Sequence, residues 1–198
     1  MSHIIHHTRA IVLGSVPRGE HDAAITFFTE SFGRLTARAL GVRKESSKLR
    51  YSLQPLTHAH VALVRGRDIW RVTGASVIDQ PYQCLSARPH AQRVLVRTMG
   101  TVRRLVAGEE VHAELYRCLE SVFAEIGEVP PAPQAMDAFE HVVLMRVCAL
   151  LGYGPQTNER VAYYTTLSPI TRDLLAEAYL DRTLLVRHIN TALHTSQL

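Results

Sequence analysis

The chain has 198 residues, of which 46% are hydrophobic and 20% charged, with a formal net charge of +4. This composition excludes a disordered chain, and no apolar run reaches the ~18–20 residues that a membrane-spanning helix needs. The length suits one large or two small domains. Because the N-terminus has no signal-peptide pattern, we expect a cytoplasmic protein.

The positive charge is concentrated in the first part of the chain. Residues 1–75 hold 11 Lys and Arg against 5 Asp and Glu, whereas residues 76–198 hold 11 against 13. A basic surface confined to one module is typical of a protein that binds a polyanion.

Residues 4–78 show a period-two pattern interrupted by turn residues, which predicts five strands. The predicted strands are Ile4–Val16, Ala23–Thr29, Arg34–Leu40, Thr57–Val64 and Ile69–Val77. Five short strands with one longer loop over residues 41–56 indicate a small closed barrel of the OB type. We therefore predict an α+β chain with an OB-fold nucleic-acid-binding domain at residues 1–79.

After Pro81 the hydrophobic period changes to 3.6, which predicts an α-helical domain over residues 80–198. The predicted helices cover about residues 91–105, 110–126, 136–150, 169–180 and 183–193. The proline-rich segment 130–133 separates the second from the third, and Gly152–Pro155 ends the third. The Ser168-Pro169 pair is expected to cap the fourth.

The third strand and the loop after it carry the densest positive charge. Leu35, Ala37 and Ala39 share one face of this strand, and the arginines lie on the other. We predict that these cations bind nucleic acid, with a merely solvated charged face as the alternative. The predicted residues are Arg34, Arg38, Arg43, Lys44, Lys48 and Arg50.

Two aromatic residues are candidates for stacking on bases, as single-strand binders require. Tyr51 ends the basic loop, and Trp70 lies in the last hairpin among Arg65, Arg67 and Arg71. Cationic and stacking surface would then be adjacent. Trp70 as a barrel-core residue is the alternative.

Catalytic and metal motifs are missing from the sequence. There is no P-loop, no G-x-G-x-x-G and no G-x-S-x-G, so we expect a protein that is not an enzyme. His58 and His60 lie two apart on a predicted strand, but no third ligand is near them. Cys84, Cys118 and Cys148 form no disulfide or metal pattern, so we expect no cofactor.

Four blocks of this sequence resemble the bacterial RecO recombination and repair proteins. The blocks are AIVLGSVPRGEHD, ITFFTESFGRLTARALGVRK, SLQPLTHAHVAL and LMRVCALLGYGP. The resemblance implies an N-terminal OB barrel and a helical C-terminal domain. It also implies binding of single- and double-stranded DNA, strand annealing and help in loading the RecA recombinase. The implied partners are RecR and the C-terminal tail of single-strand-binding protein.

Arginines recur along the first long predicted helix, opposite its apolar face. A solvated helix face is one interpretation, and a site for an acidic peptide such as that tail is the other. The residues are Arg93, Arg97, Arg103 and Arg104.

One departure from the family pattern concerns metal. Many family members carry a cysteine zinc hairpin after the Leu-Gly-Tyr-x-Pro block, whereas residues 156–164 here contain no cysteine. We therefore expect no structural zinc.

Two other functions fit the charge pattern: an OB module that binds structured RNA, and a protein-only adaptor whose basic barrel meets an acidic partner.

Overall fold

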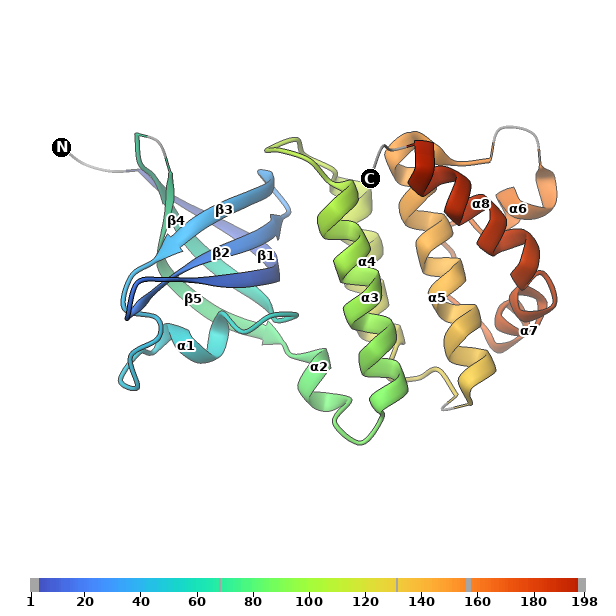
Figure 1. Cartoon of the computed structure of the whole chain (residues 1–198), viewed down its shortest axis with the longest axis horizontal. Coiled ribbons are helices and arrows are strands. Elements are labelled where there is room, and N and C mark those ends of the chain that lie inside the picture. The colour runs from blue at the N-terminus through green and yellow to red at the C-terminus, as the bar shows by residue number, and fades with distance from the viewer. Residues whose placement is uncertain (1–3, 68, 131, 156–157, 196–198) are drawn as a thin grey trace. The chain divides into compact units, whose positions relative to one another are not determined.

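The structure is a computed structural model that describes residues 4–67, 69–130, 132–155 and 158–195. The predicted α+β class is confirmed, with a five-stranded closed barrel followed by helices (Figure 1). Four residues that the sequence analysis used lie outside the described residues. They are Asp68, between the last two predicted strands, Pro131 of the proline-rich segment, and Gln156 and Thr157, where family members carry the zinc hairpin.

Contacts divide the chain into two compact units. The first comprises Met1–Tyr82 together with Ala107–Ala113, and the second comprises Gln83–Val106 and Glu114–Leu198. A domain boundary at residues 79 and 80 stays a prediction, and the short segment Ala107–Ala113 is an addition to the barrel that the sequence pattern did not indicate.

The barrel is one sheet whose strands follow the order β1-β2-β3-β5-β4 and then return to β1. Four strand pairs are antiparallel: β1–β2, β2–β3, β4–β5 and β1–β4. The ring is then closed by the pairing of β3 with β5. These two strands form a short parallel ladder, with Ala37 opposite Trp70 and Arg38 opposite Arg71. The strands are Ile5–Arg18 (β1), Asp22–Thr29 (β2), Gly33–Ala39 (β3), His58–Arg65 (β4) and Trp70–Asp79 (β5).

Alternation along the strands builds the barrel core. Ile25 and Phe27 of β2 and Leu35 and Ala37 of β3 point inward and are at most 3% exposed. Side chains at the intervening positions therefore point outward, because successive residues of a strand face opposite sides. The long loop after β3 contains one short helix, α1 (Leu49–Ser52).

Segment Ala107–Ala113 packs against the barrel at Gly33 and Trp70. The backbone N–H of Arg34 donates to the carbonyl of Gly108 (3.0 Å). The indole N–H of Trp70 donates to the Glu109 carboxylate (2.9 Å). Gly33 has a φ of 63° and lies so close to the backbone of Glu110 that a Cβ there would collide with it. Only glycine fits both demands.

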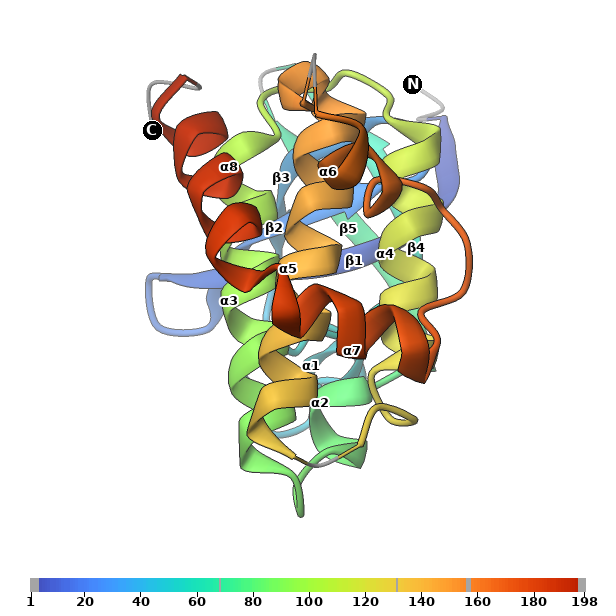
Figure 2. The ribbon, with the colours of Figure 1, turned by 90° about the vertical axis from the view of Figure 1, so that its right-hand side faces the viewer.

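The helical unit is organised around α5 (Pro133–Cys148), which contacts α3, α7 and α8 (Figure 2). Eleven α5 residues are buried, because neighbours cover the helix on several sides. Within the described part of the chain, no helix is long and apolar enough to cross a membrane. The other helices are α2 (Pro81–Cys84), α3 (Pro89–Leu105), α4 (Ala113–Glu125), the π-helix η1 (Ala149–Tyr153), α6 (Glu159–Tyr163), α7 (Arg172–Leu180) and α8 (Arg182–Thr195).

The predicted Ser168-Pro169 cap is wrong. The α7 helix begins at Arg172, and the side chain of Thr171 accepts a hydrogen bond from the Leu174 backbone N–H (3.2 Å). Ser168 is used differently, because its carbonyl accepts from the buried guanidinium of Arg146 (2.6 Å). Threonine is a good N-cap residue, and a long-range contact holds the preceding segment outside the helix.

We predict that Gly33→Ala destabilises the protein by about 2–4 kcal/mol, because the methyl group adds a backbone collision to a left-handed conformation. Gly19→Ala is the matched control: Gly19 has a φ of 69° but open space around it. That control should cost only about 1 kcal/mol. Urea unfolding followed by circular dichroism measures both losses, and equal losses would contradict the packing argument.

Candidate nucleic-acid interface

One outer face of the barrel spans β2, β3 and β5 and combines cationic with hydroxyl side chains. Its register brings Arg38 between Ala24 on one side and Arg71 on the other, and Thr26 opposite Thr36. We refer to it as the β2–β3–β5 face. Its accessible outward residues are Asp22, Ala24, Thr26, Arg34, Thr36, Arg38, Arg71 and Thr73.

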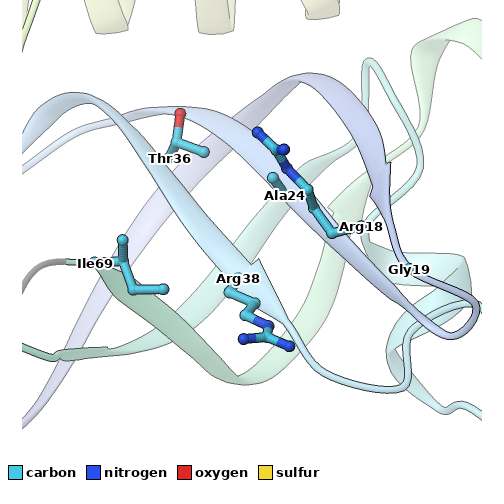
Figure 3. Close-up of a pocket in the computed structure, with 6 residues that line it drawn as sticks. All are labelled: Arg18, Gly19, Ala24, Thr36, Arg38 and Ile69. Atoms are coloured by element: carbon cyan, nitrogen blue, oxygen red, sulfur yellow. The ribbon is translucent and has the colours of Figure 1, made fainter.

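A groove of about 550 Å³ lies on this face (Figure 3). Its walls come from the end of β1, the β1–β2 turn, β2, β3 and the β4–β5 turn. The strand 2–3 face with these two turns is where OB folds bind oligonucleotides. The lining residues are Arg18, Gly19, Ala24, Thr36, Arg38 and Ile69.

Asp22 accepts hydrogen bonds that fix the groove residue Arg38 and the backbone at Gly41. Its Oδ2 accepts two hydrogen bonds from Arg38, from Nη2 (2.6 Å) and Nε (3.1 Å). Its Oδ1 accepts from the Gly41 backbone N–H (2.9 Å). The Gly41 bond and the Arg38 bonds together hold the pKa of the Asp22 carboxyl below its usual range. Arg38 is therefore fixed in orientation while remaining exposed.

Arg43 ties the basic loop to the β1–β2 turn. Its Nη1 donates to the carbonyls of Gly19 (3.0 Å) and Glu20 (3.1 Å), and its backbone N–H donates to His21 (2.9 Å). The sequence predicted that Arg43 binds nucleic acid. Its internal bonds give it a second role, because they hold in place the turn that follows Arg18, the last residue of β1.

The remaining cations of the loop are exposed. Lys44, Lys48 and Arg50 make no side-chain hydrogen bond or ion pair within the described part of the chain. Arg50 lines a second hollow of about 280 Å³, together with Arg43. These cations are accessible to a polyanion, and their binding of nucleic acid stays a prediction.

Trp70 is not the stacking platform that the sequence suggested. It is 4% exposed, belongs to the barrel core and packs against Phe32, with ring centroids 5.2 Å apart. The parallel ladder with β3 turns its side chain inward. Arg65 covers the ring at 5.3 Å and lies 3.6 Å from Glu109. Trp70 and Arg65 are thus engaged within the barrel unit.

The other predicted residues are distributed over three places. Arg34 and Arg71 belong to the β2–β3–β5 face. Arg67 is exposed in the β4–β5 turn. Tyr51 is 58% exposed on α1 and does not line the groove.

Sequence reasoning missed Arg18, Thr36 and Ile69 as groove residues. The first predicted strand ends at Val16, whereas β1 continues to Arg18, which lies opposite Asp22. Its guanidinium has no hydrogen bond or ion pair among the described residues, in contrast to Arg38. A basic residue at the first turn of a five-strand barrel was the available signal, since that turn borders the OB ligand face.

The predicted partner-binding arginines on α3 differ in their roles. Arg97 forms an ion pair with Glu140 of α5, which is 8% exposed. Burial raises the pKa of the Glu140 carboxyl, and Arg97 opposes that rise. Arg93 contacts the His90 ring (3.3 Å), and Arg103 and Arg104 are exposed. Arg97 thus lies at the surface of the helical unit and is engaged by the buried Glu140.

The residues at hand do not fit a zinc site. Among the described residues, no group of three or more His, Cys, Asp or Glu is placed to hold a metal ion. Cys118 and Cys148 are buried, where desolvation raises the pKa of each thiol to about 11. His58 is buried and His60 exposed, and burial lowers the pKa of His58.

Near the hairpin position, hydrogen bonds hold the chain. Asp181 Oδ2 accepts from Arg160 Nε (2.6 Å) and from the Tyr164 hydroxyl (2.7 Å). These bonds join α6 to the start of α8 without a metal ligand.

Comparison with known proteins gives a consistent result. The family model described as "Recombination protein O N terminal" matches residues 1–81. DNA repair protein RecO of Frankia casuarinae is 33% identical over 153 residues, covering 76% of this chain and 61% of that protein. The corresponding protein of Myxococcus xanthus is 30% identical over 161 residues, covering 76% and 65%.

A third relative matches a shorter stretch. DNA repair protein RecO of Heliobacterium modesticaldum is 40% identical over 75 residues, which are 38% of this chain and 28% of that protein. This chain therefore spans less than two thirds of the length of the relatives compared here, with coverages of 28%, 61% and 65%.

We predict that Arg97→Met destabilises the protein by about 1–2 kcal/mol near neutral pH, because Glu140 loses its partner. The Glu140 pKa then rises further. A carboxyl with a raised folded-state pKa favours folding at low pH, so the loss should grow as pH increases above about 4. Urea unfolding at several pH values measures it. In a Glu140→Gln background the same substitution should cost less, and an equal cost would contradict the ion-pair argument.

Proposed function

The chain belongs to the RecO family, and from this premise we propose that it is a non-catalytic DNA-binding mediator of recombinational DNA repair. In this role it binds single- and double-stranded DNA, promotes the annealing of complementary strands and helps the RecA recombinase to load. RecR and the C-terminal tail of single-strand-binding protein are its protein partners.

The groove on the β2–β3–β5 face is the observation that carries this proposal. It lies where OB folds take oligonucleotides, and Arg18 and Arg38 line it. Arg71 is adjacent through the β3–β5 ladder. A phosphate backbone along this face would meet three guanidinium groups, while the Asp22 carboxylate is already engaged by Arg38.

Strand annealing needs charge neutralisation and no bond chemistry. Cations that replace the counterions condensed on phosphates give sequence-tolerant, salt-sensitive affinity. Such neutralisation also lowers the repulsion between two strands that approach each other. Further positive charge lies outside the groove, on the exposed loop residues Lys44, Lys48 and Arg50.

The helical unit is proposed to take the acidic tail through the exposed arginines of α3. Arg93, Arg103 and Arg104 are exposed, and Val96 lies among them with 48% of its surface accessible. Cations beside an apolar side chain suit an acidic peptide that ends in hydrophobic residues. Arg97 contributes indirectly, through its ion pair with Glu140.

We predict that single-stranded DNA binding weakens as salt increases, with a slope in log[salt] of about −0.7 per phosphate contact. Arg18→Gln should reduce the magnitude of this slope by about 0.7, because Arg18 is accessible and forms no ion pair with any residue that the structure describes. Fluorescence anisotropy with labelled single-stranded DNA, duplex DNA and RNA at several salt concentrations measures these quantities.

Arg187→Gln, on α8 of the helical unit, is the matched control because it removes the same charge outside the groove. It should leave the slope unchanged. A slope near zero for the unmodified protein would contradict DNA binding, tighter binding of RNA would favour the RNA alternative, and partner capture without nucleic-acid affinity would favour the adaptor.

We also predict that Arg93→Glu with Arg104→Glu weakens binding of a tail peptide at least fivefold, about 1 kcal/mol, through like-charge repulsion. These positions avoid Arg97, whose replacement would leave the buried Glu140 without its ion pair. Isothermal titration with the peptide measures the effect, and Arg187→Glu serves as the control. Unchanged affinity in the double variant would rule out the α3 surface.

A further inference from the structure

The β2–β3–β5 face carries an unusual combination of side chains for a surface that binds single strands. Its accessible outward positions hold three arginines, three threonines, one alanine and one aspartate, Asp22. None of these eight accessible side chains is aromatic, because Phe28, the aromatic residue at an outward position of β2, is fully buried. Proteins that hold single strands usually add aromatic rings on which bases stack.

The aromatic side chains at the neighbouring strand positions are buried. Phe27 and Trp70 point into the barrel core, and Phe28 is fully buried. Trp70 is further fixed by its hydrogen bond to Glu109 and its contact with Phe32. For Phe27 and Trp70, reaching a base would require opening the barrel, and Phe28, at an outward position opposite Arg34, has no exposed surface on which a base could stack.

The side chains that are present suit phosphate and sugar. Arg38 uses Nε and Nη2 for Asp22, so its Nη1 remains as a donor in a fixed orientation. Arginine and threonine are common donors to phosphate oxygens, and such contacts carry no base information. Ala24 and Ile69 add small apolar surfaces to the groove, which suit a sugar ring better than a stacked base.

We propose that this face holds the sugar–phosphate backbone and leaves the bases unstacked, so that a bound strand stays free to pair with its complement. The inference rests on the proposed DNA binding and specifies which part of DNA is recognised. It also gives a physical reason for annealing, because a strand whose bases stack on protein must first be released. Binding of both single strands and duplexes follows, since both present a backbone.

The experiment compares two strands of equal length, about 16 nucleotides, the upper site size of one OB fold. One strand has mixed sequence, and the other carries abasic tetrahydrofuran residues at every internal position. We expect their Kd values for the full chain to agree within about threefold, whereas stacking of even one base would weaken the abasic strand roughly 5- to 150-fold.

Tyr51→Leu provides a second arm, because Tyr51 is an exposed aromatic residue of the barrel unit outside the groove. The substitution should leave the ratio of the two Kd values unchanged. A more than fivefold preference for the normal strand that disappears with Tyr51→Leu would overturn the inference and identify the stacking ring.

A third measurement tests the consequence for pairing. Complementary strand added to the preformed complex, followed by energy transfer between labels, should hybridise at least as fast as without protein. Slower hybridisation would overturn the inference. If neither strand binds at low salt, the proposed function fails as well, whereas selective loss of the abasic strand leaves DNA binding intact and removes only the backbone-only mode.

Discussion

The short parallel ladder between β3 and β5 is the constraint on which the rest of the barrel depends. It consists of Ala37 opposite Trp70 and Arg38 opposite Arg71. This pairing closes the ring, so no strand edge of the sheet is left between β3 and β5. It also sends Trp70 into the core and brings Arg71 beside Arg38 on the outside. The same strand register therefore determines which side chains fill the barrel core and which lie on the candidate interface.

The cations of the barrel unit divide into two groups with different physical roles. Arg38 and Arg43 are exposed yet tied to Asp22 and to the carbonyls of the β1–β2 turn. Tying a long side chain in advance reduces the rotamer entropy that ligand binding would otherwise cost. Arg18 and Arg71 make no such bonds within the described residues and can move to meet a phosphate. Two arginines of fixed orientation beside two that can move suit a ligand whose sequence varies.

The helical unit shows why a row of arginines is a weak guide to function by itself. Arg93, Arg97 and Arg104 recur at helical spacing, yet Arg97 neutralises the buried Glu140 of α5. Arg146, although on the same central helix as Glu140, is buried and donates to the carbonyl of Ser168. Arg104 is exposed and has no hydrogen bond or ion pair of its side chain among the described residues, in contrast to Arg97. Charge in this unit therefore serves both packing and, as proposed, recognition.

The sequence by itself determined the strands, the five-strand barrel and the basic character of one face, because alternation fixes which side chains of a strand share a side. Leu35 and Ala37 inside with Arg34 and Arg38 outside is such a case. Only the tertiary structure decided which outward residues meet. The groove joins residues from separate strands and turns, and the Asp22–Arg38 and Trp70–Glu109 bonds span 16 and 39 positions of the chain. Periodicity carries no information on such long-range pairs, since they depend on how the ring closes.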